Sequence, residues 1–291
     1  MKYAIFTVCM PELSIEDAAA ALAKIGYDGV EWRVTAAPQP GQPVVNYWSG
    51  NRCTVDEATI GTSIKTAIAA CKKNKLAIPA LGTYLHYSTP DRVEACMAAA
   101  AEAGAKSIRV GVDGYKGDTH FETLFKKAVK GYAKIEKLAR KYRVKACPEI
   151  HMGLITPSCS SMRRFVEHFD PKYVGVIHDA GNMRYEGFEN WKMGLEILGP
   201  YLTHVHVKNA ACRISGAMKD TTLQWSTDAA AMNKGLVNWH DVFTALKAVG
   251  YNGWLSLEDF SSEQPTIEKL TFDLAYLKGI EKAVFGPAKK K

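Results

Sequence analysis

The sequence predicts one (β/α)8 barrel, formed by a single domain over residues 1–291. Eight short apolar segments alternate with longer segments of helical periodicity along the chain, which is the pattern of repeated strand–helix units. The apolar segments are runs of Val, Ile and Leu without strict alternation, as in strands that are buried on both faces of a parallel sheet. The length of 291 residues also suits one barrel, which needs about 250 residues.

The first strand–helix unit carries the clearest local signals. A helix is predicted over residues 14–25 because Ser14 is a favourable N-cap, Asp17 follows three residues later, and Gly26 can end the helix. A second helix is predicted over residues 121–142. The turn at 26–29 that leads into the second strand returns in similar form at 250–254, which indicates that one unit is repeated. The eight strands are predicted to begin near Tyr3, Gly29, Leu76, Ser107, Val144, Val174, Leu202 and Trp254.

Closure of the sheet into a barrel is favoured over an open, doubly wound sheet. An open sheet would share the apolar runs, but no Gly-x-Gly-x-x-Gly motif follows any predicted strand. Two connections are unusually long, at residues 35–59 and 209–237. Both follow strands, so in a barrel they lie on the face that carries active sites. Loops of this length are usually functional or disordered.

The composition argues against several classes of protein. Lys and Arg number 37 against 30 Asp and Glu, for a net charge of +7; this mild excess suits polar or anionic partners and does not require nucleic acid. Seven cysteines without C-x-x-C spacing indicate reduced thiols in a cytoplasmic protein. The apolar run at residues 3–9 is too short to span a membrane. We expect neither a membrane nor a nucleic-acid partner, and a homo-oligomer stays open.

Four potential metal ligands lie at the carboxyl ends of the last four predicted strands. They are Glu149, Asp179, His206 and Glu258. Side-chain alternation along a strand directs all four into the barrel, where buried carboxylates are costly unless they are neutralised. Each residue alone would more often be structural, but four equivalent positions favour a metal site. The oxygen-rich set predicts one divalent ion, Mn²⁺ first, with Mg²⁺, Co²⁺ or Zn²⁺ as alternatives.

These motifs, in this order, resemble the xylose isomerase-like TIM barrels. That superfamily includes sugar-phosphate isomerases and epimerases, ketose 3-epimerases, inosose-processing enzymes and, more distantly, endonuclease IV. The resemblance extends over nearly the whole chain. It implies that the four residues above bind the metal and that Glu149 and Glu258 are also the catalytic acid–base pair. The motifs are Gly-Tyr-Asp-Gly-Val-Glu at 26–31, Pro-Glu-Ile-His at 148–151, His-Asp-Ala-Gly-Asn at 178–182, His-Val-Lys-Asn at 206–209, Gly-Tyr-Asn-Gly-Trp at 250–254 and Leu-Glu at 257–258.

The resemblance implies a metal-dependent isomerase or epimerase of a small-molecule carbohydrate: a sugar, keto-sugar or cyclitol. Removing a proton next to a carbonyl requires stabilisation of the enediolate, and a metal chelated by the substrate's oxygens supplies it. One glutamate would take the proton and the other would return it; which does which stays open. No Gly-rich phosphate cradle is evident, which favours an unphosphorylated substrate.

Three other hypotheses about the function stay open. A metal-dependent lyase or hydrolase acting on an oxidised (keto) glycoside would use the same proton abstraction. A nuclease like endonuclease IV would need additional histidines for three zinc ions, but Arg33 and Asp113 stand where these are expected. The Asp-x-His pair expected after the seventh strand is also missing. A barrel without activity is disfavoured because all four ligand types are present.

Substrate-binding positions are predicted around the four ligands. His151 shares the inward face of its strand with Glu149, and Asn182 stands where the family often has histidine. Arg213 and Trp225 are included because they lie on the long segment 209–237, which is expected to act as a lid. Each position has a structural alternative, such as a core histidine, a rim lysine or a turn-capping asparagine. The predicted set is Glu31, His86, His151, Asn182, Lys208, Arg213 and Trp225.

Overall fold

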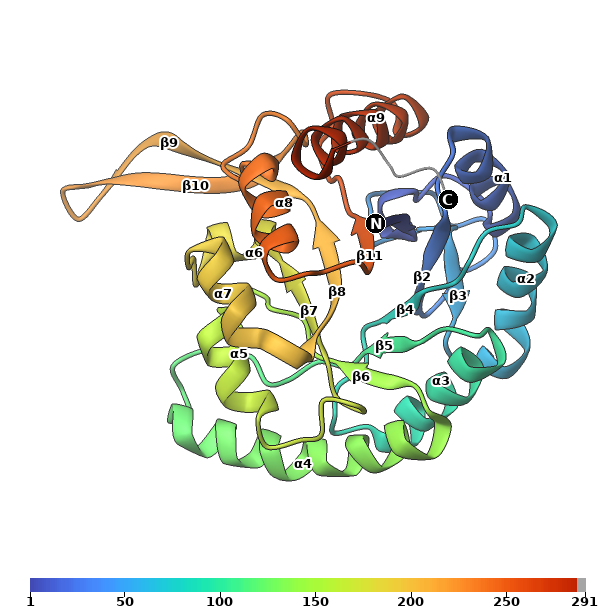
Figure 1. The fold of residues 1–291 in the computed structure, drawn as a ribbon, viewed down its shortest axis with the longest axis horizontal. Coiled ribbons are helices and arrows are strands. Elements are labelled where there is room, and N and C mark those ends of the chain that lie inside the picture. The colour runs from blue at the N-terminus through green and yellow to red at the C-terminus, as the bar shows by residue number, and fades with distance from the viewer. Residues whose placement is uncertain (287–291) are drawn as a thin grey trace.

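In the computed structural model, which describes residues 1–286, strands form a central barrel and helices surround it (Figure 1). Residues 287–291 of the predicted domain lie outside the described part of the chain. Within the described residues, eight parallel strands make up the barrel. They are β1 (Lys2–Phe6), β2 (Gly29–Thr35), β4 (Ala80–Thr83), β5 (Ser107–Arg109), β6 (Lys145–Cys147), β7 (Val176–Asp179), β8 (Leu202–Val207) and β11 (Trp254–Leu257).

Backbone hydrogen bonds connect these strands into a nearly closed ring. The order around the ring is β6–β5–β4–β2–β1–β11–β8–β7. Isolated parallel bridges from Ala146 to Val174 and from Glu149 to Ile177 join the two ends. All strands run parallel, so their carboxyl ends meet at one rim, where barrel enzymes carry their active sites. The predicted (β/α)8 barrel is confirmed.

The helices cover the outside of the barrel (Figure 1). The first begins and ends as the sequence predicts: the Ser14 side chain accepts a hydrogen bond from the Asp17 N–H, and Gly26 has a left-handed φ of 102°. The helix predicted at 121–142 also forms. Within residues 1–286 the α-helices are α1 (Ile15–Ile25), α2 (Ile60–Lys73), α3 (Pro90–Glu102), α4 (Phe121–Tyr142), α5 (Cys159–Val166), α6 (Ala180–Tyr185), α7 (Trp191–Leu198), α8 (Trp239–Ala248) and α9 (Thr266–Phe285).

Two segments expected to be long loops contain strands. In the second, β9 (Asn209–Lys219) and β10 (Thr222–Ala230) form an antiparallel hairpin that projects away from the barrel (Figure 1). Most of its residues are exposed, so the sequence lacks the buried face that normally reveals a strand. In the first, β3 (Thr54–Asp56) pairs with β2 beside the barrel.

The third barrel strand begins later than predicted, at Ala80 instead of near Leu76. Pro79 precedes it and has no N–H for a strand ladder, which explains the shift. Among the described residues, none of the helices combines the length and hydrophobicity that crossing a bilayer requires. All seven cysteines are free thiols in the structure.

Candidate metal centre

The four predicted ligands meet in one buried group at the carboxyl-end rim. Asp179 is the last residue of β7, and it is paired in register with His206 of β8. Glu258 directly follows β11, and Glu149 follows β6 after one proline. One potential ligand atom from each residue lies within 4.8 Å of the others, and all four residues are buried. The strand-end positions predicted from the sequence therefore converge in space.

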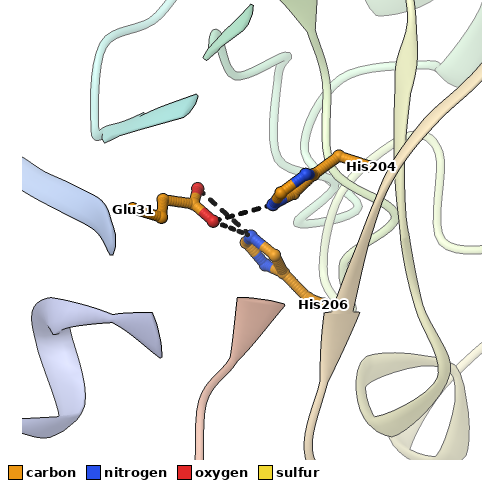
Figure 2. Close-up of side chains that lie close together, drawn as sticks. All are labelled: Glu31, His204 and His206. Atoms are coloured by element: carbon orange, nitrogen blue, oxygen red, sulfur yellow. Dashed lines mark hydrogen bonds and ion pairs between the residues drawn. The ribbon is translucent and has the colours of Figure 1, made fainter. Parts of the chain in front are cut away.

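His206 lies at the centre of this group. Its Nδ1 is 2.8 Å from Oε1 of Glu149, 3.5 Å from Oε1 of Glu258 and 3.9 Å from Oδ2 of Asp179. Its Nε2 faces the other way and lies 3.2 Å from Oε2 of Glu31 (Figure 2). Nδ1 is therefore the imidazole atom that can share a metal with the three carboxylates.

Two cationic side chains contact the carboxylates. Nζ of Lys208 lies 2.5 Å from Oε2 of Glu258 and 2.8 Å from Oδ2 of Asp179. Arg109, the last residue of β5, donates from Nη1 to Oε2 of Glu149 at 2.7 Å. Burial disfavours both cations, but the surrounding carboxylates raise the pKa of Lys208 and of Arg109 above their ordinary values. Both side chains therefore stay charged.

The carboxylates differ in how well their charge is compensated. Burial alone would raise the pKa of Glu149, but Arg109 and other cationic neighbours hold it well below the usual range. Burial raises the pKa of Asp179 to about 7, because Lys208 offsets only part of the effect and nearby carboxylates add repulsion. Oδ2 of Asp179 is buried and accepts no hydrogen bond of good geometry from the described residues. Asp179 thus lacks a full complement of partners.

This donor set fits a divalent cation. The three ligand carboxylates and that of Glu31 are buried, and two partly buried cations, Arg109 and Lys208, contact the ligand carboxylates. When the central imidazole is neutral, as a metal ligand must be, the carboxylates exceed the cations by two negative charges. One divalent cation balances this excess of negative charge. Oδ2 of Asp179 and the inward Nδ1 of His206 supply coordinating atoms of the kind that Mn²⁺, Mg²⁺, Co²⁺ or Zn²⁺ accept.

A pocket of about 300 Å³ opens at this group. Glu149, Glu258 and Lys208 line it, as do two other predicted substrate residues, His86 and His151. Aromatic rings contribute much of the wall: Phe6, Trp48, Tyr84 and Phe260. A mostly apolar wall with a few converging polar groups is typical of small-molecule sites.

The other four predicted substrate residues do not line the pocket: Glu31, Asn182, Arg213 and Trp225. Asn182 is buried, its amide donates to the carbonyl of Ile150 at 3.2 Å, and it lies 3.4 Å from Oε1 of Glu149. Its neighbours are thus protein groups, as in the structural alternative for this position. Glu31 is buried and faces the imidazole rings of His204 and His206 (Figure 2).

The expected lid residues lie elsewhere. Arg213 and Trp225 are exposed on the projecting hairpin β9–β10, whose strands pair with each other. A lid was expected because the segment was long and followed a strand. Its antiparallel pairing stiffens it as an arm that extends away from the barrel (Figure 1).

Arg109 is a site residue that the sequence did not single out. The same strand-end criterion that selects Glu149 would select Arg109, but Val110 and Val112 extend the apolar run, so the sequence predicts that the fourth strand ends at Asp113. The strand ends at Arg109 instead. Asp113 lies outside the metal group, where it pairs with Lys127 at 3.0 Å and accepts a hydrogen bond from the Tyr87 hydroxyl.

Solved structures share this fold. The 3-keto-D-glucoside 4-epimerase from E. coli has a TM-score of 0.72 at 17% identity over 96% of this chain and 99% of its own. The IOLI protein with a bound zinc atom has a TM-score of 0.75 at 15% identity over 99% and 100%. A Mycobacterium smegmatis protein in complex with magnesium has a TM-score of 0.70 at 14% identity over 97% of each chain.

Comparisons of the sequence identify relatives and a family. The inosose dehydratase of Geobacillus thermodenitrificans is 25% identical over 186 residues, which cover 57% of this chain and 60% of that protein. A second inosose dehydratase, from Bacillus cereus, is 26% identical over 47% of each chain. The matched segments therefore span less than two thirds of these relatives. The family model described as xylose isomerase-like TIM barrel matches residues 19–279, a range that includes all four candidate ligands. The chain belongs to the xylose isomerase-like TIM barrel family.

Proposed function

We propose that this protein is a divalent-metal-dependent isomerase or epimerase of a small sugar, keto-sugar or cyclitol. The observation that carries the proposal is the pair Glu149 and Glu258. They come from strands that β7 and β8 separate in the ring, they line the same pocket, and each offers an oxygen to the candidate metal site. Two positioned carboxylates are what proton removal and proton return at one carbon require.

Neighbouring side chains orient each glutamate for proton transfer. Arg109 donates to Oε2 of Glu149, so the carboxylate is ionised and its orientation is set. Lys208 donates to Glu258 and also borders the pocket, where its ammonium can donate to a substrate oxygen. One glutamate takes the proton from the carbon next to the carbonyl, and the other returns a proton to it.

The residues that would hold the metal are Glu149, Asp179, His206 and Glu258. When bound, a divalent ion would stabilise the negative charge that develops on the substrate oxygens as the proton leaves. The oxygen-rich ligand set favours Mn²⁺ over softer choices. Zinc and magnesium in two structures of the same fold support a divalent ion.

The pocket favours an uncharged substrate of monosaccharide or cyclitol size. Its volume is about 300 Å³, at the lower end of the range for small-molecule sites. With a divalent ion in place, the buried carboxylates and cations of the site balance. No permanent cation is then left over for a phosphate. Trp48 and Phe260, whose ring centroids are 5.1 Å apart, offer apolar surface to a sugar face.

A dehydratase is the second candidate function. The observation that favours it is the set of relatives named inosose dehydratase. Loss of water from a keto-cyclitol begins with the same proton removal next to a carbonyl. The leaving hydroxyl then needs an acid, and His151 lines the pocket near Glu149. The two functions therefore share the base and differ in the fate of the hydroxyl.

The experiment that tests the proposal is a panel of keto-sugars and inososes in deuterated water with excess Mn²⁺. For an isomerase or epimerase, we expect products of unchanged composition that carry solvent deuterium at the carbon next to the carbonyl. A product lacking one molecule of water would identify the dehydratase instead. Turnover without solvent exchange would contradict proton abstraction by an exchanging glutamate.

A further inference from the structure

Glu31 lies next to the candidate metal site and is at hydrogen-bond distance from two histidines. It is fully buried and lies in β2, whereas both histidines lie in β8. Its Oε2 is 2.9 Å from Nε2 of His204 and 3.2 Å from Nε2 of His206, and its Oε1 is 3.3 Å from Nε2 of His206. Figure 2 shows the carboxylate pointing between the two imidazole rings.

The ring of His206 contacts Phe6, His204 and Glu31, and its Nδ1 edge faces the metal group. Phe6 stacks on its face, with centroids 5.7 Å apart and planes 25° apart. His204 packs against it edge-on, at 5.5 Å and 80°. Glu31 faces its Nε2 atom. Only Nδ1 faces the carboxylates of the metal group, and Glu149 is its nearest partner.

We propose that Glu31, itself oriented by His204, is a positioning residue that keeps the proton of His206 on Nε2 and so presents Nδ1 to the metal. A neutral imidazole has one N–H, and a carboxylate acceptor determines which nitrogen carries it. Metal-bound histidines are commonly oriented in this way by a carboxylate on the other nitrogen. The inference rests on the metal site of the proposed function.

A second metal ion is the competing explanation. Glu31, His204 and His206 form another group of potential ligands. However, the imidazole nitrogens are already at hydrogen-bond distance from the carboxylate, and neither Glu31 nor His204 lines the pocket. Hydrogen bonding accounts for the arrangement without an ion, and metal stoichiometry separates the two explanations.

The test compares Mn²⁺ binding by the unmodified protein, Glu31→Gln and Glu281→Gln. The amide of Glu31→Gln keeps the shape of the side chain but removes its negative charge, so it holds the proton of His206 on Nε2 less strongly. Glu281→Gln is the matched control, because Glu281 bonds the Tyr3 hydroxyl and the N-terminus and takes no part in the metal group. We expect Glu31→Gln to bind one Mn²⁺ about 10–100-fold more weakly and Glu281→Gln to bind as the unmodified protein does.

Several results would overturn the inference. An unchanged Mn²⁺ dissociation constant in folded Glu31→Gln would show that Glu31 does not position the ligand. Two ions in the unmodified protein and one in Glu31→Gln would make Glu31 a ligand. Absence of Mn²⁺ binding to the unmodified protein would overturn both this inference and the proposed function, whereas weak binding to Glu31→Gln alone supports both.

A measurement on the unmodified protein keeps the inference testable even where Glu31→Gln does not fold. In the protein loaded with Zn²⁺, the imidazole ¹⁵N signals of His206 report which nitrogen carries the proton. We expect a slowly exchanging proton on Nε2 and none on Nδ1. A proton on Nδ1 would overturn the inference.

Discussion

Two groups of buried carboxyl groups meet at two consecutive residues, since Glu258 belongs to one group and Asp259 to the other. They differ in the side chains that contact them. The pocket carboxylates are those of Glu149, Asp179 and Glu258, which border or lie beneath the pocket. The rear pair is Asp259 and Asp273, which lies on the other side of the strand end. All five residues are almost completely buried. Consecutive side chains point to opposite sides of an extended segment, so adjacent residues of the chain belong to different groups.

Cations near several strand ends neutralise the pocket carboxylates, whereas at the rear pair the described residues supply Lys269 of α9. Nζ of Lys269 donates to the carbonyl oxygens of Asp259 and Ser261, both at 2.9 Å. Neither carboxyl oxygen of Asp273 has a hydrogen-bond partner in the described structure. Burial and the neighbouring Asp259 raise the pKa of Asp273 to about 8. The rear pair therefore resolves its charge by holding a proton.

The difference shows that burial of carboxylates does not by itself identify an active site. In the pocket, Arg109 keeps Glu149 ionised at neutral pH, and a ligand can reach the oxygens. At the rear pair, protonation removes the charge, and neither Asp259 nor Asp273 lines the pocket beside Glu149. We therefore expect substitutions in the pocket to affect chemistry and metal binding, and substitutions at the rear pair to affect stability alone.

The largest expected effect is on turnover. Glu149→Gln and Glu258→Gln should each reduce kcat by a factor of about 10²–10⁴, the usual contribution of a positioned acid or base. The amide preserves side-chain shape but cannot take up the proton. The measurement is turnover of the keto-sugar or inosose substrate with metal in excess, so that weakened binding is not mistaken for lost proton transfer.

Asp273→Asn and Glu281→Gln are the controls for this prediction, because they also replace a carboxylate by an amide. Both should retain kcat. If both glutamine variants of the pocket turned over normally with metal bound, another residue would move the proton, and His151 would be the first to test.

The next effect is on metal affinity. Asp179→Asn removes a carboxylate from the candidate ligands and should weaken Mn²⁺ binding by more than the roughly 10–100-fold that loss of a ligand's orienting partner costs. Asp273→Asn should leave binding unchanged. Calorimetric titration with Mn²⁺ measures both. Full metal occupancy in a folded variant with alanine at Glu149, Asp179, His206 and Glu258 would refute the site.

Much of the fold was predictable because local signals and tertiary structure agree. Ser14 and Gly26 cap the first helix as their chemistry requires, and apolar runs mark strands buried on both faces. The exceptions have physical reasons. The hairpin β9–β10 buries neither face, and the apolar residues beyond Arg109 disguise the end of β5.

The residues of the site could be predicted only where they follow an apolar run that marks the end of a strand. Glu149, Asp179, His206 and Glu258 follow apolar runs, so the sequence predicts their shared rim. The contact of Glu31 with His204 joins residues 173 positions apart, and nothing local in either strand indicates it. It depends on how β2 and β8 face each other across the closed ring.

The comparison also predicts the number of ions. Because hydrogen bonds account for the group of Glu31, His204 and His206, and the rear pair includes no imidazole, we expect one divalent ion per chain and no ion at the rear pair. We also expect no incision of abasic DNA. Elemental analysis and an abasic-site cleavage assay measure these outcomes. Three zinc ions with cleavage above background would restore the nuclease interpretation.

The smallest effect concerns stability and belongs to the rear pair. An aspartate in the unfolded chain titrates near pH 3.9, whereas the pKa of folded Asp273 is about 8. Between these values the folded state binds the additional proton. The stability that Asp273 contributes is therefore fully present below the unfolded pKa and is lost as pH rises through the folded one, with a slope of at most about 1.4 kcal/mol per pH unit.

Asp273→Asn cannot titrate, so its unfolding free energy should fall less steeply with pH than that of the unmodified protein. Other groups, including Asp179 with a pKa of about 7, contribute to both proteins, so the difference between the two slopes isolates Asp273. Urea unfolding at intervals from about pH 5 to about pH 8 measures both slopes. Parallel profiles would show that Asp273 releases its proton at ordinary acidity, and that the rear pair, like the pocket, is neutralised by a cation.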